Sequence, residues 1–112
     1  MSANRRNFFR VRASLRFTFA WEEGFELFRT VDVSACGAYV LRHIPAGAMP
    51  TLGTVGECAF NLESMEIRVS AKVVRVSSNG FAVRFDELPR AKEDRICGWV
   101  YRQETRRDPL AD

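Results

Sequence analysis

Three arginines gather within the first ten residues of the chain, where Arg5, Arg6 and Arg10 form the run Arg-Arg-Asn-Phe-Phe-Arg. An arginine side chain presents a rigid planar fork that bonds to phosphate or to the O6/N7 edge of guanine, and it also stacks on bases. A purine nucleotide that carries phosphates would use all three modes. Taken alone, the cluster fits equally well a solubilising tail in which Phe8 and Phe9 pack into the core.

A second polar group lies at the end of a predicted strand, in the run Asp-Val-Ser-Ala-Cys-Gly that contains Asp32, Ser34 and Gly37. Because residues i and i+2 of an extended chain share a face, we expect Asp32 and Ser34 to project together while Val31 and Val33 face the core. A carboxylate accepts hydrogen bonds from guanine N1–H and its exocyclic amine, a hydroxyl serves base or phosphate, and a glycine lets a ligand approach the backbone. The alternative is an Asx or Ser turn with the glycine at positive φ.

Enzymatic chemistry has little support in the sequence. The single histidine, His43, lies just before Pro45 in a predicted loop without an evident partner. The sequence contains no glycine-rich phosphate loop, no His-Glu-x-x-His and no nucleophile elbow. The acidic pairs at 22–23 and 86–87 fall at predicted turns or strand ends, where charged side chains are usually solvated. We therefore expect a binding protein and not an enzyme.

The composition indicates one compact domain. A chain of 112 residues with 46% hydrophobic and 28% charged residues is typical of a soluble globular protein that folds without metal or disulfide support. The three cysteines, Cys36, Cys58 and Cys97, are widely spaced and suggest neither a disulfide framework nor a zinc site, and no cofactor is expected. No apolar run resembles a signal peptide or a membrane span, so we expect a cytoplasmic protein without membrane insertion.

The net charge of +3 is modest, and five arginines fall within the first sixteen residues. This distribution favours a local anion site over the broad basic stripe of nonspecific nucleic-acid binders. A single-stranded nucleic-acid binder stays as a less favoured alternative, because a small barrel with exposed arginines and aromatic residues could stack bases. The strand at 80–85 superficially resembles an RNA-recognition signature but lacks its leading Lys/Arg and its second aromatic residue.

Six segments either alternate apolar and polar residues or are rich in β-branched and aromatic residues, as strands are. They are residues 15–21, 25–33, 37–41, 55–62, 65–76 and 80–85. Short turns or loops separate them, including a loop rich in glycine and proline over 43–56. Within 65–76 the apolar residues change phase after Val73, to Val74 and Val76, which predicts a bulge and a change of the face turned to the core.

A helix is predicted after Pro89, because Ile96 and Val100, and likewise Cys97 and Tyr101, lie four residues apart. Usual helix statistics give it about a dozen residues. The predicted fold is therefore mainly all-β: a six-stranded antiparallel barrel with one C-terminal α-helix. We divide the chain into a flexible arginine-rich segment at 1–11, the barrel with its helix at 12–104, and a frayed tail at 105–112.

The two polar groups together resemble the two signature motifs of the PilZ family, Arg-Arg-x-x-x-Arg and Asp/Asn-x-Ser-x-x-Gly. Arg5, Arg6 and Arg10 match the first motif, and Asp32, Ser34 and Gly37 match the second. Their order, their separation by one hairpin, the Val-Val-Arg run at 73–75, the strand at 80–85 and the closing helix also resemble that family. The resemblance covers roughly residues 4 to 104, and no motif position is substituted.

This resemblance implies a receptor for the bacterial second messenger cyclic di-GMP. The three arginines would clamp phosphates and guanine faces, Asp32 and Ser34 would bind guanine edges, and Gly37 would give the ligand close access. An arginine-rich segment without strand periodicity is expected to be mobile alone and to order when a dianionic ligand bridges it to the barrel.

The same resemblance bears on partners. With no second domain in the sequence, the signal would pass to a separate effector protein, which the sequence does not identify, or to a second copy of the chain in a homodimer. The main alternative is a PilZ-like interaction module that works without nucleotide, in motility or in type IV pilus assembly. Ligand titration separates the two.

Overall fold

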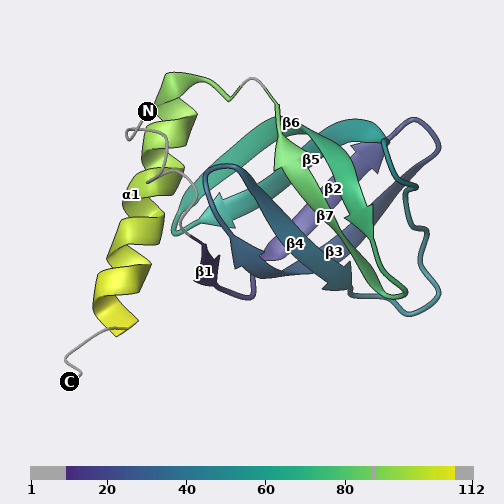
Figure 1. The fold of residues 1–112 in the computed structure, drawn as a ribbon, viewed down its shortest axis with the longest axis horizontal. Coiled ribbons are helices and arrows are strands. Elements are labelled where there is room, and N and C mark those ends of the chain that lie inside the picture. Colours follow the sequence, from purple (N-terminus) through teal and green to yellow (C-terminus); the bar gives the residue numbers. More distant parts are fainter. Residues whose placement is uncertain (1–9, 87, 108–112) are drawn as a thin grey trace.

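The structure is a computed structural model of the chain, and it describes residues 10–86 and 88–107 (Figure 1). The described part contains seven strands and one helix. These are β1 (Val11–Arg12), β2 (Arg16–Trp21), β3 (Gly24–Val33), β4 (Gly37–Arg42), β5 (Val55–Leu62), β6 (Met65–Val76), β7 (Gly80–Phe85) and α1 (Arg90–Arg107).

Six of the strands close into an antiparallel barrel. They pair in the order β3-β2-β5-β6-β7-β4, and β4 pairs back onto β3. The short strand β1 adds to β3, and α1 stands at the end of the barrel beside β1 (Figure 1). The predicted six-stranded barrel with one C-terminal helix is confirmed, whereas β1 was not predicted, because two residues are too few to show periodicity.

Aromatic side chains fill the barrel. The alternation that predicts each strand sends one residue in two to the interior, and six buried phenylalanines meet there. They are Phe17, Phe19, Phe28, Phe60, Phe81 and Phe85. The ring of Phe60 stacks between Phe17 and Phe85, with 5.8 Å between ring centroids on each side. Such pairs add about 0.5–1.5 kcal/mol each beyond the area that they bury, so the stacked rings help to hold the barrel together.

The helix closes one end of this core. Ile96, Trp99 and Val100 are buried, while Tyr101 is 69% exposed, so only part of the predicted apolar pattern faces the barrel. The helix has 18 residues, more than the dozen expected, because no breaking residue occurs before Pro109. Residues 105–107 of the predicted C-terminal tail belong to this helix, and the rest of that predicted segment lies outside the described residues.

Two bulges interrupt the barrel strands. The bulge in β6 between Val73 and Arg75 confirms the prediction from the change of phase. The predicted switch of core face is wrong, because Val74 and Val76 are 42% and 43% exposed. Val74 is the extra residue of the bulge and Val76 ends the strand, so neither can reach the core. A second bulge, which was not predicted, lies in β3 between Thr30 and Asp32.

A buried threonine attaches the N-terminal part of the chain to β3. Thr30 is 4% exposed, its hydroxyl donates to the Ala13 carbonyl, and it accepts the Leu15 N–H at 2.8 Å. Val11 is also buried and pairs with Val33. The chain is therefore held to the barrel from Val11 onward, so the predicted flexible segment over 1–11 extends too far at its C-terminal end. Its residues 1–9 lie outside the described residues.

Candidate ligand-binding site

The short strand β1 brings the two sequence motifs together. Arg12 of β1 pairs with Asp32 of β3, which places the preceding Arg10 next to the same carboxylate. Arg10 Nη1 lies 2.6 Å from Asp32 Oδ1, and the two side chains are 57% and 23% exposed. One residue of each motif thus meets in an ion pair on the outer face of the barrel. Arg5 and Arg6 lie outside the described residues.

Ser34 does not project beside Asp32, contrary to the prediction. It is 1% exposed, and its Oγ accepts the Cys36 N–H at 3.0 Å and the Gly37 N–H at 3.3 Å. The alternation of side chains fails here because β3 carries a bulge before Asp32 and ends at Val33. The Ser turn of the alternative prediction is present, but the positive φ that it gave to Gly37 is not. The hydroxyl shapes the β3–β4 connection from inside.

Gly37 begins β4, where two strands approach very closely. A Cβ at this position would lie 2.0 Å from the Val83 carbonyl oxygen of β7, which no side chain can tolerate. Its φ is not in the positive range, which among the described residues is found only at Gly53 and Glu63. Strand packing by itself therefore requires the glycine. Cys36 and Gly37 also line the hollow described next.

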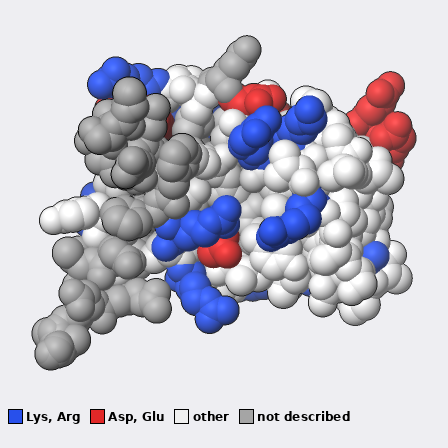
Figure 2. Space-filling model, viewed as in Figure 1, with Lys and Arg blue, Asp and Glu red and all other residues white. Residues whose placement is uncertain are grey.

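An open hollow of about 260 Å³ lies beside the Arg10–Asp32 ion pair, on the outer face of β4, β7 and β6. Its lining residues combine three arginines with small or apolar side chains. They are Arg10, Cys36, Gly37, Val74, Arg75, Ala82, Val83 and Arg84. Figures 1 and 2 share one view, in which β4 and β7 lie toward the viewer. Figure 2 shows lysine and arginine side chains gathered on this face. The hollow is suited to an anion with flat or apolar parts.

Sequence reasoning singled out Arg10 and Gly37 of this hollow but missed Arg75 and Arg84. Arg84 lies between the buried residues Val83 and Phe85, so alternation alone could have placed it outside. Arg75 could be placed only after the bulge had been located. Which strands lie next to each other also had to be known before either arginine could be assigned to the site.

The thiol of Cys36 forms a neutral part of the wall. Burial raises the pKa of this thiol above its ordinary value of 9.0, and the nearby Arg10 guanidinium opposes that shift without cancelling it. The thiol is therefore protonated at neutral pH and adds no negative charge to the hollow.

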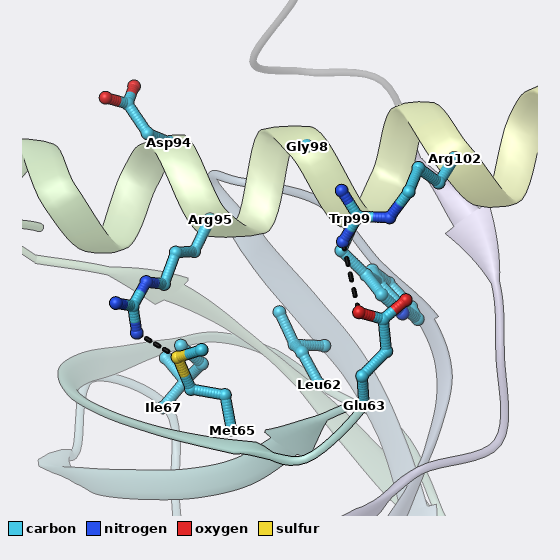
Figure 3. Close-up of a pocket in the computed structure, with 9 residues that line it drawn as sticks. All are labelled: Leu62, Glu63, Met65, Ile67, Asp94, Arg95, Gly98, Trp99 and Arg102. Carbon is cyan, nitrogen blue, oxygen red and sulfur yellow. Dashed lines mark hydrogen bonds and ion pairs between the residues drawn. The ribbon is translucent and has the colours of Figure 1, made fainter.

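A second hollow, of about 150 Å³, lies between α1 and the β5–β6 hairpin (Figure 3). Arg102 Nη2 bonds to Glu63 Oε1 at 3.2 Å at one side, and Arg95 contacts the Met65 sulfur at the other. Trp99 lies between them against the barrel. These contacts join the helix to the hairpin, and no motif residue takes part, so this hollow is not the candidate site.

Among the described residues, no three histidine, cysteine, aspartate or glutamate side chains are grouped so that they could hold a metal ion. The one described helix is not both long and apolar enough to cross a membrane.

The closed barrel, its helix and the cationic hollow define a small β-barrel domain with a candidate anion site, and comparisons with known proteins identify its family. The family model for the PilZ domain matches residues 4–102. This match covers most of the chain, and the chain belongs to the PilZ domain family. A comparison with curated protein sequences gives no match.

Solved structures share the fold. The Bacillus subtilis inhibitor of motility MotI/DgrA matches with a TM-score of 0.77 and 17% identity over 88% of this chain and 50% of that one. YcgR from Escherichia coli, in complex with c-di-GMP, matches with a TM-score of 0.73 and 19% identity. The match covers 89% of this chain and 46% of that one. The PilZ domain of CeSA from a cellulose-synthesising bacterium matches with a TM-score of 0.67 and 20% identity. The match covers 87% of this chain and 99% of that one. The chain thus spans about half the length of the first and second of these structures.

Proposed function

We propose that this chain binds cyclic di-GMP in the cationic hollow and relays the signal to a separate effector protein in the bacterial cytoplasm, without catalysing a reaction. The observation that carries this proposal is the meeting of Arg10 and Asp32, one residue from each motif, at the edge of the hollow. A phosphate binder and an acceptor for guanine donors are thereby presented side by side.

The charges of the hollow suit a dianionic ligand with two guanines. Arg10, Arg75 and Arg84 supply three guanidinium groups, and a guanidinium binds phosphate through two parallel hydrogen bonds. Asp32 is acceptor-only when ionised, so it would select a base edge that carries donors, such as guanine N1–H with its exocyclic amine. Arg5 and Arg6 would complete the clamp from the N-terminal side.

The remaining motif residues would act mainly through the backbone. The buried hydroxyl of Ser34 holds the N–H groups of Cys36 and Gly37, and this gives the β3–β4 connection its shape. Gly37 has no side chain, so β4 lies close against β7 at the point where both border the hollow. The likeness to YcgR, whose structure is a complex with c-di-GMP, supports the proposal through the shared fold.

The test is calorimetric titration of the chain with cyclic di-GMP. Titrations with GTP and with cyclic di-AMP serve as controls for selectivity. Removing the charge-assisted contact in Arg10→Ala should cost roughly 1.5 to 3 kcal/mol, or about ten- to a hundredfold in affinity. Arg68→Ala is the matched control, because Arg68 is an exposed arginine that lies outside the hollow. Asp32→Ala should reduce the preference for cyclic di-GMP over cyclic di-AMP, since adenine lacks the guanine donors.

Selective binding that falls in Arg10→Ala and stays in Arg68→Ala would support the receptor function. An absence of heat and of any thermal shift with all three nucleotides would overturn it. A nucleotide-independent interaction module would then be the better account of this PilZ domain.

A further inference from the structure

Two arginines lie directly opposite each other on the outer face of the β2–β3 hairpin. Arg16 of β2 pairs with Arg29 of β3, and both are exposed. The Thr30 N–H donates to the Leu15 carbonyl at 3.0 Å, so the backbone hydrogen bonds lie beside the arginine pair and not within it. In such a non-hydrogen-bonded pair the two Cα atoms are only about 4.5 Å apart, and the side chains are at their closest.

No carboxylate balances this pair of charges. Among the described residues, neither Arg16 nor Arg29 takes part in an ion pair, and the Arg29 Nε–H donates to the neutral hydroxyl of Ser14 at 3.1 Å. Arg68 of β6, in contrast, lies within 4.0 Å of two glutamates. Like charges directly opposite each other destabilise a sheet. Such a local conflict is expected where residues serve a function, and here it leaves two guanidiniums for an external anion.

Apolar side chains continue the same outer face toward the β2–β3 turn. Residues of one face recur at every second position, so Leu27 and Phe25 follow Arg29 along β3, about 7 and 13 Å away. Phe28, which lies between Leu27 and Arg29, is buried, whereas Leu27 is half-buried and Phe25 is 64% exposed. Ala20 of β2 lies opposite Phe25. The face therefore has a cationic end and an apolar end.

This face lies away from the cationic hollow. In the closed order β3-β2-β5-β6-β7-β4, β2 is three strands from β7 in either direction, so the two strands are on opposite sides of the barrel (Figure 1). β7 forms part of the wall of the hollow. A nucleotide in the hollow would therefore leave the β2–β3 face accessible to a partner.

We propose that the outer face of the β2–β3 hairpin docks an acidic segment of the effector protein. A carboxylate of the segment binds between Arg16 and Arg29, and an apolar side chain packs on Leu27 and Phe25. This inference rests on the relay step of the proposed function and uses no residue of the nucleotide site. A guanidinium binds a carboxylate through two parallel hydrogen bonds, and an exposed phenylalanine supplies the aromatic contact that interfaces favour.

The charges around this face favour a protein partner. A nucleic acid is bound by neutralising many phosphates, whereas Glu57 of β5 and Glu66 of β6 lie on the neighbouring strands and would repel a polyanion. Glu22 and Glu23 form the exposed turn next to Phe25, so an anionic membrane surface would be repelled at the apolar end. A short acidic segment brings its charge only to the arginine pair.

The test is a fluorescence anisotropy titration of the full chain into a labelled synthetic peptide. The peptide has two adjacent glutamates and phenylalanines two and four residues beyond them, a spacing that matches the face when the segment is extended. Binding is expected, and it should weaken as salt rises. Two further peptides, with lysine in place of glutamate or serine in place of phenylalanine, should bind at least about tenfold more weakly.

Arg16→Glu distinguishes a binding role from a structural one. It places a carboxylate opposite Arg29, so the unfolding temperature should rise, whereas binding of the acidic peptide should weaken about tenfold or more. Phe25→Ser should also weaken binding and should leave the unfolding temperature nearly unchanged, because Phe25 is mostly exposed. Arg68→Thr is the matched control: it removes an exposed strand arginine that two glutamates already balance, and it should bind the peptide like the wild-type chain.

Three results would overturn the docking surface. The first is that the acidic peptide does not bind, or binds Arg16→Glu as tightly as the wild-type chain. The second is a lower unfolding temperature in Arg16→Glu, because the arginine pair would then serve the fold. The third is tighter binding of phosphatidylserine vesicles or of an oligonucleotide that is lost in Arg16→Glu, because the face would then belong to a membrane or a nucleic acid.

Calorimetry with cyclic di-GMP separates this inference from the nucleotide site. A chain that binds the nucleotide but not the acidic peptide keeps the receptor function and loses the docking surface. A chain that binds the peptide but no nucleotide keeps the docking surface and loses the receptor function.

Discussion

Arg10 and Asp32 are 22 residues apart in the sequence and share an ion pair of 2.6 Å between Nη1 and Oδ1. Both side chains are proposed to contact the ligand, and in this structure they bond to each other. A ligand that binds here has to replace this contact with its own phosphate and guanine hydrogen bonds. The pair places both groups at the edge of the hollow, with the Arg10 side chain 57% exposed and the Asp32 side chain 23% exposed.

The Arg10–Asp32 pair should contribute little to the stability of the fold. Because both groups reach solvent, a double-mutant cycle of Arg10→Ala and Asp32→Ala, measured by urea unfolding, should give a coupling energy of about 0.2–1 kcal/mol. The coupling should shrink further at high salt. A coupling above about 2 kcal/mol would mean that the pair is structural, and effects of these variants on ligand binding would then need reinterpretation.

Ser34→Ala should destabilise the fold although Ser34 belongs to the ligand motif. The change leaves the N–H groups of Cys36 and Gly37 without their buried acceptor, which should cost about 1–3 kcal/mol of unfolding free energy. Ser14→Ala is the control, because Ser14 is exposed and accepts the Arg29 Nε–H at the surface. Denaturant unfolding of both variants makes the comparison, and equal stabilities would contradict the assigned role of Ser34.

Replacing glycine by alanine should change the stability of the fold in opposite directions at Gly37 and at Gly98. Gly37→Ala places a Cβ 2.0 Å from the Val83 carbonyl oxygen, and moving two paired strands apart should cost about 3 kcal/mol, the upper end of the usual cost of overpacking. In Gly98→Ala the nearest atom is the end of the Arg102 side chain at 3.4 Å, so the gain in helix propensity should stabilise the fold by about 0.5–1 kcal/mol. Thermal unfolding of both variants tests the pair, and a stable Gly37→Ala would show that the β4–β7 contact is looser than the structure has it.

Cys58 should make stability fall at alkaline pH. Burial raises the pKa of this thiol from 9.0 to about 12. Below pH 9 the thiol is protonated in both states, and its contribution to stability is fully present. Between pH 9 and about 12 the unfolded chain releases this proton while the folded chain keeps it, so the unfolding free energy should drop by up to roughly 1.4 kcal/mol per pH unit.

The measurement is urea unfolding of the wild-type chain and of Cys58→Ala across this pH range. Tyrosines and lysines titrate in both proteins, so the difference between the two slopes isolates the thiol. Parallel slopes would show that the Cys58 proton is not linked to folding.

Much of the fold could be predicted because its signals are local. Phe17 and Phe19 alternate with polar neighbours, and that period of two requires a strand whatever lies beside it. The bulge in β6 was also readable, since an extra residue shifts the apolar phase within one segment. The burial of Ser34 could not be read in this way, because it depends on where β3 ends and on a bulge that leaves no trace in the apolar pattern.

The sequence by itself determined the six barrel strands, the order of the hairpins, the helix and the two motifs, because spacing along the chain and side-chain chemistry are local properties. Only the tertiary structure decided that Arg10 meets Asp32, that the Ser34 hydroxyl serves the backbone, and that Arg16 lies directly opposite Arg29. These relationships arise when the barrel closes, since closure sets which strands are neighbours and in which register, and many weak side-chain contacts determine that register together.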